Sequence, residues 1–387
     1  MKLIFTGDIN FRGLEGLDSE QFRKIVSEVK PYFDSCDFSI VNLETPLADK
    51  EKHSPIYKSG PNLISSPKNV TFLKALGADV CTIANNHIGD FGEGAVLDTL
   101  DTLSKNGILY CGAGENTENA YNAVRLEKDG VSVSFISVCE NEFGMATETA
   151  AGSAGYNPRL LLNKIKQEKA KSNHVIVVFH GGNEFNPLPS PDTQERYRLI
   201  LDMGADAVVG GHTHCPQGYE IYDGKPIFYS MGNFLFKSST EREENNSWYY
   251  GYMPILELSE SGIAFEIIPY KFNISATKIS VFSGENKEKM LNYIEKLSKI
   301  AEDKKLLDSY FGGWAYLHRW VPSAPNNIND LSDYNAAGHY NLISCESHNS
   351  QAKRLLRAFL ENDVETLKKT PKRFRSFREC RYESNNF

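Results

Sequence analysis

The sequence of 387 residues lacks any long hydrophobic run, so hydropathy predicts no membrane span. The chain begins MKLIFTGD, where the acidic residue at position 8 leaves too few apolar residues for the hydrophobic region of a signal peptide. We therefore expect a cytoplasmic protein. The sequence also contains no internal repeat and no low-complexity tract, which excludes solenoid and fibrous architectures.

Positive charge is scarce as well. The 42 Lys and Arg residues stand against 50 Asp and Glu residues, which gives a formal net charge of -8. Such a chain has no general attraction to nucleic acid or to an anionic membrane, and an anionic substrate would need local positive charge such as metal ions supply. The seven cysteines include no C-x-x-C pair, and their odd number argues against a disulfide framework. Reduced thiols are the simpler prediction.

What is present is the composition of an ordinary folded protein, with 41% hydrophobic and 24% charged residues. Short apolar runs of strand type alternate with amphipathic helical segments, a pattern that predicts an α/β fold. One such segment is 19–30, for which Ser19 is a plausible N-cap and Pro31 lies just beyond the expected end.

Polar side chains follow successive strands at the point where each strand ends. These residues are Asp8, Glu44, Asn86 with His87, His180, and the pair His212 and His214. Active-site groups collect at such strand ends in α/β sheets. A mixed set of carboxylates, an amide and imidazoles suits a pair of divalent ions such as Mn, Fe or Zn. A single strand-end histidine is more often structural, but the joint pattern favours a metal site.

Several further residues are candidates for the same site, each with a structural alternative. Lys58 lies in the loop 49–66 and could contact an anionic substrate, or the loop could be a solvated connection. Asp90 and Glu184 could orient a ligand histidine as part of the catalytic apparatus, and a turn or helix-cap hydrogen bond is an equal alternative. His348 either caps or packs a C-terminal helix or reaches the substrate.

The C-terminal part changes character. Alternating apolar residues in 248–272 predict an antiparallel pair that turns at Ser261-Gly262. Beyond it, 285–309 and 349–369 read as charged helices, joined by an irregular segment, 321–338. We therefore expect one domain over residues 1–272 and a helical extension over 273–387 that packs on it.

The motifs along the chain resemble a known family. In order, GD, NLETPL, ANNH followed by D-x-G, H-x-G-x-E and G-G-H-x-H before a GNF strand are similar to the CapA family, also called poly-gamma-glutamate or capsule biosynthesis proteins, in the calcineurin-like metallophosphoesterase superfamily. The resemblance covers residues 1 to about 236. It implies a sandwich of two mixed β-sheets flanked by helices, with metals at the strand exits, here followed by a C-terminal helical appendage.

The resemblance also implies residue roles. Carried over by position, the first-metal ligands are Asp8, Asn10 and His214, the bridging ligand is Glu44, and the second-metal ligands are Asn86, His180 and His212. His87 matches the histidine that contacts the phosphate and protonates the leaving group. Asn10 stands where many phosphoesterases have histidine, and Glu44 where they have Asp, and both departures are typical of the CapA branch.

Two functions follow as expectations. If two ions bind, their shared water would ionise near neutral pH and attack a phosphorus or carbonyl centre. The first expectation is therefore a metal-dependent hydrolase of a phosphoester or related bond, linked to poly-gamma-glutamate or capsule polymer metabolism, whose substrate is an anionic small molecule or polymer. The alternative is a non-catalytic accessory subunit that binds the polymer and assists its synthesis.

Overall fold

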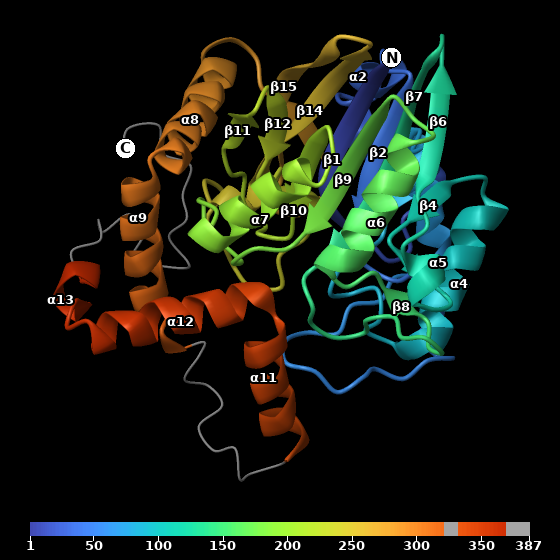
Figure 1. Ribbon diagram of the computed structural model, residues 1–387. Coiled ribbons are helices and arrows are strands. Elements are labelled where there is room, and N and C mark those ends of the chain that lie inside the picture. Colours follow the sequence, from blue (N-terminus) through green and yellow to red (C-terminus); the bar gives the residue numbers. More distant parts are fainter. Residues whose placement is uncertain (321–331, 369–387) are drawn as a thin grey trace.

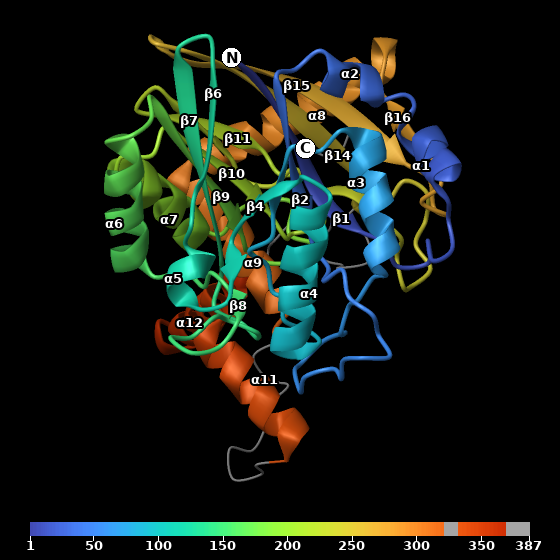
Figure 2. The same ribbon diagram turned by 90° about the vertical axis from the view of Figure 1, so that its right-hand side faces the viewer.

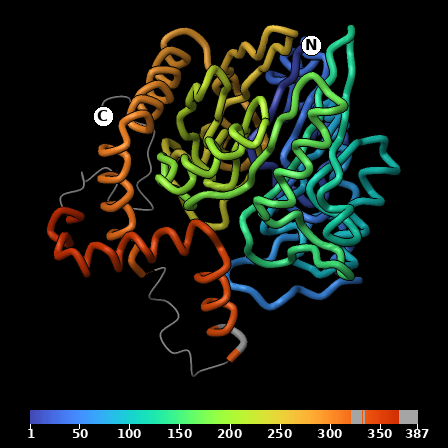
Figure 3. Tube along the Cα trace, viewed as in Figure 1, coloured from blue at the N-terminus to red at the C-terminus, as the bar shows by residue number. Residues whose placement is uncertain are grey.

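The computed structural model describes residues 1–320 and 332–368. Two β-sheets pack face to face, and helices cover their outer faces, so that the body is a helix–sheet–sheet–helix sandwich (Figures 1 and 2). Helices of the C-terminal part run along the outside of this body and continue beyond it, as the orange and red tube in Figure 3 shows. The expected α/β sandwich with C-terminal helices is confirmed.

The eight-stranded sheet is built around β1 (Lys2–Asn10), in which every residue after the first is buried. Its strand order is β16 (Ile279–Val281), β15 (Gly262–Phe272), β14 (Tyr250–Ser259), β1, β2 (Phe38–Leu43), β3 (Val80–Thr82) and β4 (Leu109–Cys111), with β13 (Asn233–Phe236) also pairing β1. The strands β13, β1, β2, β3 and β4 pair in parallel. Their carboxyl ends therefore lie at one edge of the sheet.

The six-stranded sheet has a parallel centre too. Its order is β11 (Tyr219–Tyr222), β12 (Lys225–Phe228), β10 (Ala207–Gly211), β9 (His174–His180), β7 (Val131–Cys139) and β6 (Val124–Lys128). The expected hairpin is β6–β7, and β12, β10, β9 and β7 pair in parallel. The register places Gly211 beside His180, so β9 and β10 end at the same level. A small third sheet joins β5 (Ala113–Gly114) to β8 (Gly152–Ser153).

Helices complete the layers. α6 (Pro158–Lys169) and α7 (Pro191–Asp202) pack on the six-stranded sheet, and α1 (Ser19–Val26), α2 (Lys30–Asp34), α3 (Val70–Leu76) and α4 (Gly92–Lys105) lie on the side of the other sheet, with α5 (Thr117–Ala120) near β5 (Figure 2). The main hydrophobic core lies between the sheets, where the rings of Phe5 and Phe135 meet edge to face at 6.1 Å. A second core lies beneath α6 and α7.

The elements after residue 272 begin as part of the two-sheet sandwich. β16 pairs with β15, so the eight-stranded sheet continues past the expected boundary at residue 272. α8 (Gly284–Glu302) packs on β11 and β15. Asp303 then caps α9 (Lys304–Leu317), and α11 (Asp333–Ser344), α12 (Glu346–Leu360) and α13 (Val364–Leu367) follow. α9, α12 and α13 share a small hydrophobic core of their own.

Local details differ from the sequence prediction in four places, one of which is the expected helix 349–369, where the structure has two helices, α12 and α13. The expected helix 19–30 is two helices, because Asp18, not Ser19, forms a capping box with Gln21, and Pro31 lies in the first turn of α2. The expected helix 285–309 breaks at Asp303. Helix α11 occupies part of the segment 321–338 that was predicted to be irregular, while residues 321–331 lie outside the described residues.

The structure bears on two features that the sequence was expected to lack, a membrane-spanning helix and disulfide bonds. Across residues 1–320 and 332–368, no helix combines the length and the hydrophobicity that a membrane crossing requires. The six cysteines within these ranges are free thiols, as expected, and Cys380 lies outside the described residues.

Candidate metal centre

The strands β1 and β2 supply two buried carboxylates. Asp8 lies in register with Asn42 on β2 and with Asn233 on β13. The Nδ2 of Asn42 donates to Asp8 Oδ1 at 2.6 Å, and the backbone N–H of His212 donates to Asp8 Oδ2 at 3.1 Å. Glu44 follows the end of β2, and both carboxylates are inaccessible to solvent. The two acids therefore lie at the carboxyl edge of the sheet, as predicted.

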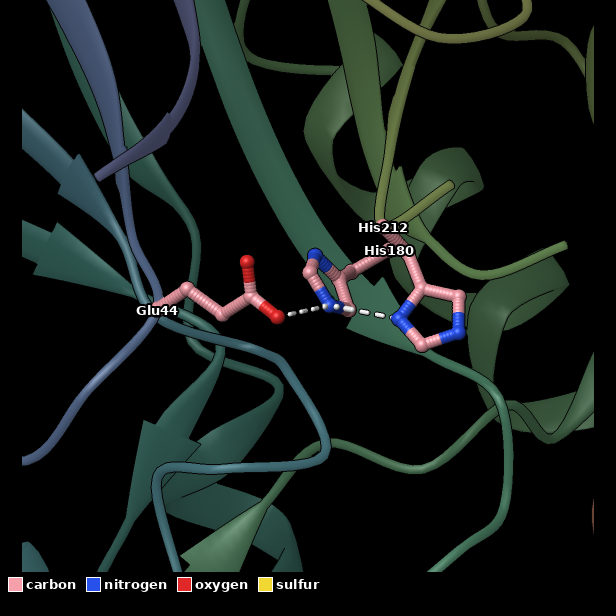
Figure 4. A group of neighbouring side chains, drawn as sticks. All are labelled: Glu44, His180 and His212. Atoms are coloured by element: carbon pink, nitrogen blue, oxygen red, sulfur yellow. Dashed lines mark hydrogen bonds and ion pairs between the residues drawn. The ribbon is translucent and has the colours of Figure 1, made fainter. Parts of the chain in front are cut away.

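The six-stranded sheet supplies three imidazoles. His180 ends β9, and its Nε2 lies 3.1 Å from His212 Nδ1 and 3.5 Å from Glu44 Oε1 (Figure 4). The φ angles of His212 and His214 are 92° and 57°, in the left-handed region that most side chains avoid. Each such residue costs about 1–3 kcal/mol and persists only where the surroundings enforce it, which is common at functional sites.

The two sheets approach each other closely at this edge. A Cβ atom at Gly211 would lie 2.8 Å from Asp8 Oδ1, which is closer than real Cβ contacts. Glycine is therefore needed at the end of β10 to bring the imidazole-bearing turn against the carboxylates.

The side chains form two groups that suit metal ions. One group is Glu44, His180 and His212, and the other is Asp8, Glu44 and His214, with the ligand atoms of each group within 4.8 Å of one another. Asn86 Oδ1 lies 3.1 Å from His180 Nε2 and adjoins the first group. Both oxygens of Glu44 are buried and have no hydrogen-bond donor among the described residues. Since a buried carboxylate needs a cation or donors, this set fits divalent ions, with Glu44 common to both groups.

The buried acids and imidazoles at the centre shift one another's pKa values, and a bound cation would favour the ionised carboxylates. Burial opposes ionisation of Asp8, but His214 and His180 lower the pKa of this carboxyl to about 2. Burial and the charge of Asp8 raise the pKa of Glu44 well above its usual range. Burial lowers the pKa of His180 to about 4, so its ring is a neutral ligand at pH 7. Burial opposes protonation of His214, but the charges of Glu44 and Asp8 raise its pKa to about 9.

Beside the two groups, Lys58, His87 and Asp90 form a hydrogen-bonded chain. Asp90 Oδ2 accepts from His87 Nδ1 at 2.7 Å, and Asp90 Oδ1 accepts from Lys58 Nζ at 2.5 Å. His87 Nε2 is then free to face Glu44 Oε1, 3.9 Å away. Burial and the charge of Lys58 lower the pKa of His87 to about 4. The alternative in which Asp90 caps α4 is wrong, because Phe91 is the N-cap of that helix.

Residues 2–238 match the family described as "Bacterial capsule synthesis protein PGA_cap". The chain belongs to this family. It is 29% identical over 281 residues to "Capsule biosynthesis protein CapA" of Bacillus anthracis, covering 70% of this chain and 67% of that relative. It is 28% identical over 313 residues to "PGA biosynthesis protein CapA" of Bacillus subtilis (strain 168), covering 78% of this chain and 80% of the relative. A putative 5'-nucleotidase from Staphylococcus aureus, solved with alpha-ketoglutarate, shares 15% identity with a TM-score of 0.43, covering 76% of this chain and 58% of that chain.

In this member of the PGA_cap family, Asn10 lies at the end of β1 but faces the backbone. Its Nδ2 donates to the carbonyl oxygen of Glu44 at 3.0 Å, and its Oδ1 accepts from the N–H of Arg12 at 2.9 Å. Both ends of the amide are thus engaged, and the contact positions the segment that carries Glu44. The role of Asn10 as a metal ligand stays a prediction.

The remaining predicted residues meet at one cavity of about 410 Å³, whose lining includes Lys58, His87, Glu184 and His348. Glu184 opens onto this cavity and forms no hydrogen bond or ion pair within the part of the chain that the structure describes. Desolvation by the cavity walls opposes ionisation of Glu184, but the surrounding imidazoles, His214 first, lower its pKa. The roles of these residues in substrate binding and catalysis stay predictions.

Three residues beside the ligands were not predicted from the sequence. Asn42 lies two positions before Glu44, so strand periodicity could have placed both on one face. The Nδ2 of Asn233 donates to a backbone carbonyl, and its Oδ1 therefore accepts from His214 Nδ1 at 2.9 Å. Glu142 Oε1 lies 4.0 Å from His212 Nε2, and burial raises the pKa of this carboxyl to about 7. No sequence pattern marks Glu142, because it follows β7 in an irregular segment.

We expect Asn42→Ala to weaken ion binding by about 10- to 100-fold, since loss of an outer-shell hydrogen bond misorients metal ligands. The Nδ2 of Asn42 donates to Asp8 Oδ1 at 2.6 Å, so the substitution releases this carboxylate. Calorimetric titration of the metal-free protein with Mn²⁺ measures the effect. Asn157→Ala removes an amide that caps the distant helix α6 and serves as the matched control. Equal Mn²⁺ affinities for Asn42→Ala and the unmodified chain would contradict the assignment.

Proposed function

We propose that this chain is a metal-dependent hydrolase of a phosphoester or related bond and that it acts in capsule or poly-gamma-glutamate metabolism. The observation that carries the proposal is Glu44, whose two buried oxygens lack donors among the described residues and belong to both groups of ligand atoms. Family membership and the names of the two Bacillus relatives support the place in polymer metabolism.

The ligand groups and the Lys58, Asp90 and His87 chain have separate roles in the proposed reaction. Divalent ions held by the two groups would supply the positive charge that activates water and neutralises charge on the reacting oxygen. Asp90 accepts from His87 Nδ1 and is itself held by Lys58, so the ring is fixed with its Nε2 facing the centre. An anion bound beside His87 favours the protonated ring, so the same Nε2 can then donate a proton to the leaving oxygen.

Non-catalytic binding of an anionic polymer is a second candidate function, and Asn10 is the observation that favours it. Because position 10 is asparagine, the group of Asp8, Glu44 and His214 gains no further imidazole there, and the amide of Asn10 already contacts the backbone at both ends. An ion held weakly by that group would attract an anion but activate water poorly.

The test is to count ions and measure turnover on the same preparation. The protein is stripped with a chelator, reloaded with Mn²⁺, Fe²⁺ or Zn²⁺, and analysed by elemental mass spectrometry. Turnover of bis-p-nitrophenyl phosphate, p-nitrophenyl phosphate and a γ-glutamyl anilide is then assayed. We expect about two ions per chain and ion-dependent cleavage of an ester. Ion binding without any turnover would favour the binding function, and failure to bind ions would overturn both.

A further inference from the structure

The C-terminal helices form one wall of the cavity at the metal centre. In Figure 1, α12 and α11 lie beyond the carboxyl ends of the strands of the six-stranded sheet. The strand-end residues Asn86, His87 and His214 line one side of the cavity, while Trp314 on α9, Asn341 on α11 and Gln351 on α12 line the other. The match to the PGA_cap family ends at residue 238, so this wall is contributed by a part of the chain outside the matched region.

The wall is fixed to the strand that carries His180. Directly after β7, the N–H of Glu140 donates to the carbonyl oxygen of His180 at 3.0 Å. The carboxylate of Glu140 accepts from Arg196 at 2.7 Å and from Ser347 Oγ, in the first turn of α12, also at 2.7 Å. The neighbouring Asn141 donates to Glu346 from its backbone and from its side chain. These buried contacts hold α12 in one position relative to the centre.

Three amide side chains that line the cavity have an unused acceptor, Asn183 after β9, Asn341 on α11 and Gln351 on α12, and backbone carbonyls fix the orientation of the first and the last. Asn183 donates from Nδ2 to the carbonyl oxygen of Ser347 at 3.2 Å, and Gln351 donates from Nε2 to that of His318 at 2.9 Å. Because a carbonyl oxygen only accepts, these contacts fix which end of each amide is nitrogen. Asn183 Oδ1 and Gln351 Oε1 are buried and have no donor within the described ranges. Buried acceptors are rarely left unpaired, so these two oxygens are available to an N–H or O–H group that enters the cavity.

The cavity also contains a cation suited to an anionic group. Arg12 is partly buried in the lining, and no carboxylate lies within 4.0 Å of its guanidinium in residues 1–320 and 332–368. Arg242, another lining residue, lies over the rings of Phe185 and Trp248 at 5.0 Å and 4.6 Å. The guanidinium of Arg12, which forms no ion pair within the described residues, lines the same cavity as these neutral acceptors, and this combination suits a ligand that carries both an anionic group and a hydrogen-bond donor.

We propose that the wall of α9, α11 and α12 selects the substrate, and that Asn183 and Gln351 accept from a neutral N–H or O–H group while Arg12 pairs with an anionic group of the same molecule. The proposal deepens the proposed function and rests on it. The donor has two possible sources, the amide of a γ-linked glutamyl chain and the hydroxyl of a sugar phosphate. Both place a donor within a few bonds of a carboxylate or phosphate.

The experiment compares three probes by calorimetry on the full chain, both metal-free and loaded with Mn²⁺. The probes are γ-glutamylglutamate, glucose 1-phosphate and inorganic phosphate. Inorganic phosphate supplies an anion without the neutral donor group of a larger substrate. We expect Gln351→Met to weaken one donor-bearing probe by about tenfold and to leave inorganic phosphate unchanged. The probe affected identifies the source of the donor. Gln194→Met is the matched control, because Gln194 is buried and hydrogen-bonded outside the cavity lining.

A second variant on the opposite wall guards against a simple loss of folding. We expect Arg12→Met to weaken the same probe by about tenfold, although Arg12 lies outside the C-terminal helices. Equal weakening of all three probes by Gln351→Met, no weakening of any, or no binding of either donor-bearing probe to the unmodified chain would overturn the proposal. Probe binding without hydrolysis would defeat the proposed function alone, and hydrolysis with unchanged discrimination would defeat this inference alone.

Discussion

Replacing Glu44 by Gln is expected to abolish ion binding at both groups, so that the ion content falls from about two per chain to below about 0.2. Glu44 is the one acid common to the two groups, and both of its oxygens lack donors among the described residues. The metal-free variant should also unfold at a higher temperature than the metal-free unmodified chain, because a neutral amide replaces a buried carboxylate that has no hydrogen-bond donor among the described residues. Elemental analysis and thermal unfolding with and without Mn²⁺ measure both effects.

The second signature of Glu44→Gln is the loss of stabilisation by added metal. An ion at a hundredfold excess over its Kd stabilises the folded chain by about 2.7 kcal/mol, and this increment should vanish in the variant. Glu220→Gln is the matched control, since Glu220 is buried and accepts from Arg198 at 2.7 Å and 2.9 Å. It should lower the free energy of unfolding and keep the ion content. A Glu44→Gln protein that still binds both ions would falsify the shared-ligand assignment.

His87→Gln is expected to lower kcat by about 10²- to 10⁴-fold while the ion content stays unchanged. The ring belongs to neither group of ligand atoms. Its Nε2 faces the centre, 3.9 Å from Glu44 Oε1, and from this position it would donate a proton to the leaving group. The loss should depend on the leaving group. An alkyl ester needs protonation and should show the full effect, while a p-nitrophenyl ester leaves without a proton and should show little.

The matched control for His87 is His53→Gln. His53 Nε2 lies 2.8 Å from Asp98 Oδ2, so it repeats the pairing of an imidazole with an aspartate outside the cavity lining. This variant should keep both kcat and ion content. If His87→Gln slows alkyl and p-nitrophenyl esters by the same factor, His87 acts on substrate position and not as the proton donor.

The residues at strand ends could be predicted because their signal is local. His180 directly follows the apolar run 175–179, while Asp8 and Glu44 lie within three residues of shorter apolar runs, and parallel pairing brings the ends of such runs to one edge. The order of the motifs then predicts the family, and the match over residues 2–238 confirms that prediction. The antiparallel pair β14–β15 and the hairpin β6–β7 were predictable for the same reason, since period-2 patterns and turn residues are read within a few positions.

The wall of the cavity could not be predicted, because its geometry depends on contacts between distant segments. Asn183 and Gln351 are ordinary amides in the sequence and become notable only when Ser347 and His318 take their N–H groups. Helix α11 was missed because its polar composition gives almost no amphipathic period. Glu142 likewise gains meaning only from burial beside His212. Tertiary packing overrides local pattern at each of these positions.

The metal centre lies across the junction of two sheets, with Asp8 and Glu44 on one and His180, His212 and His214 on the other. No continuous stretch of the chain contains a full ligand set, so an ion would find either group complete only after the two sheets have docked. A bound ion would add to the hydrophobic contacts between the two sheets and to cross-sheet hydrogen bonds such as that from His212 N–H to Asp8 Oδ2.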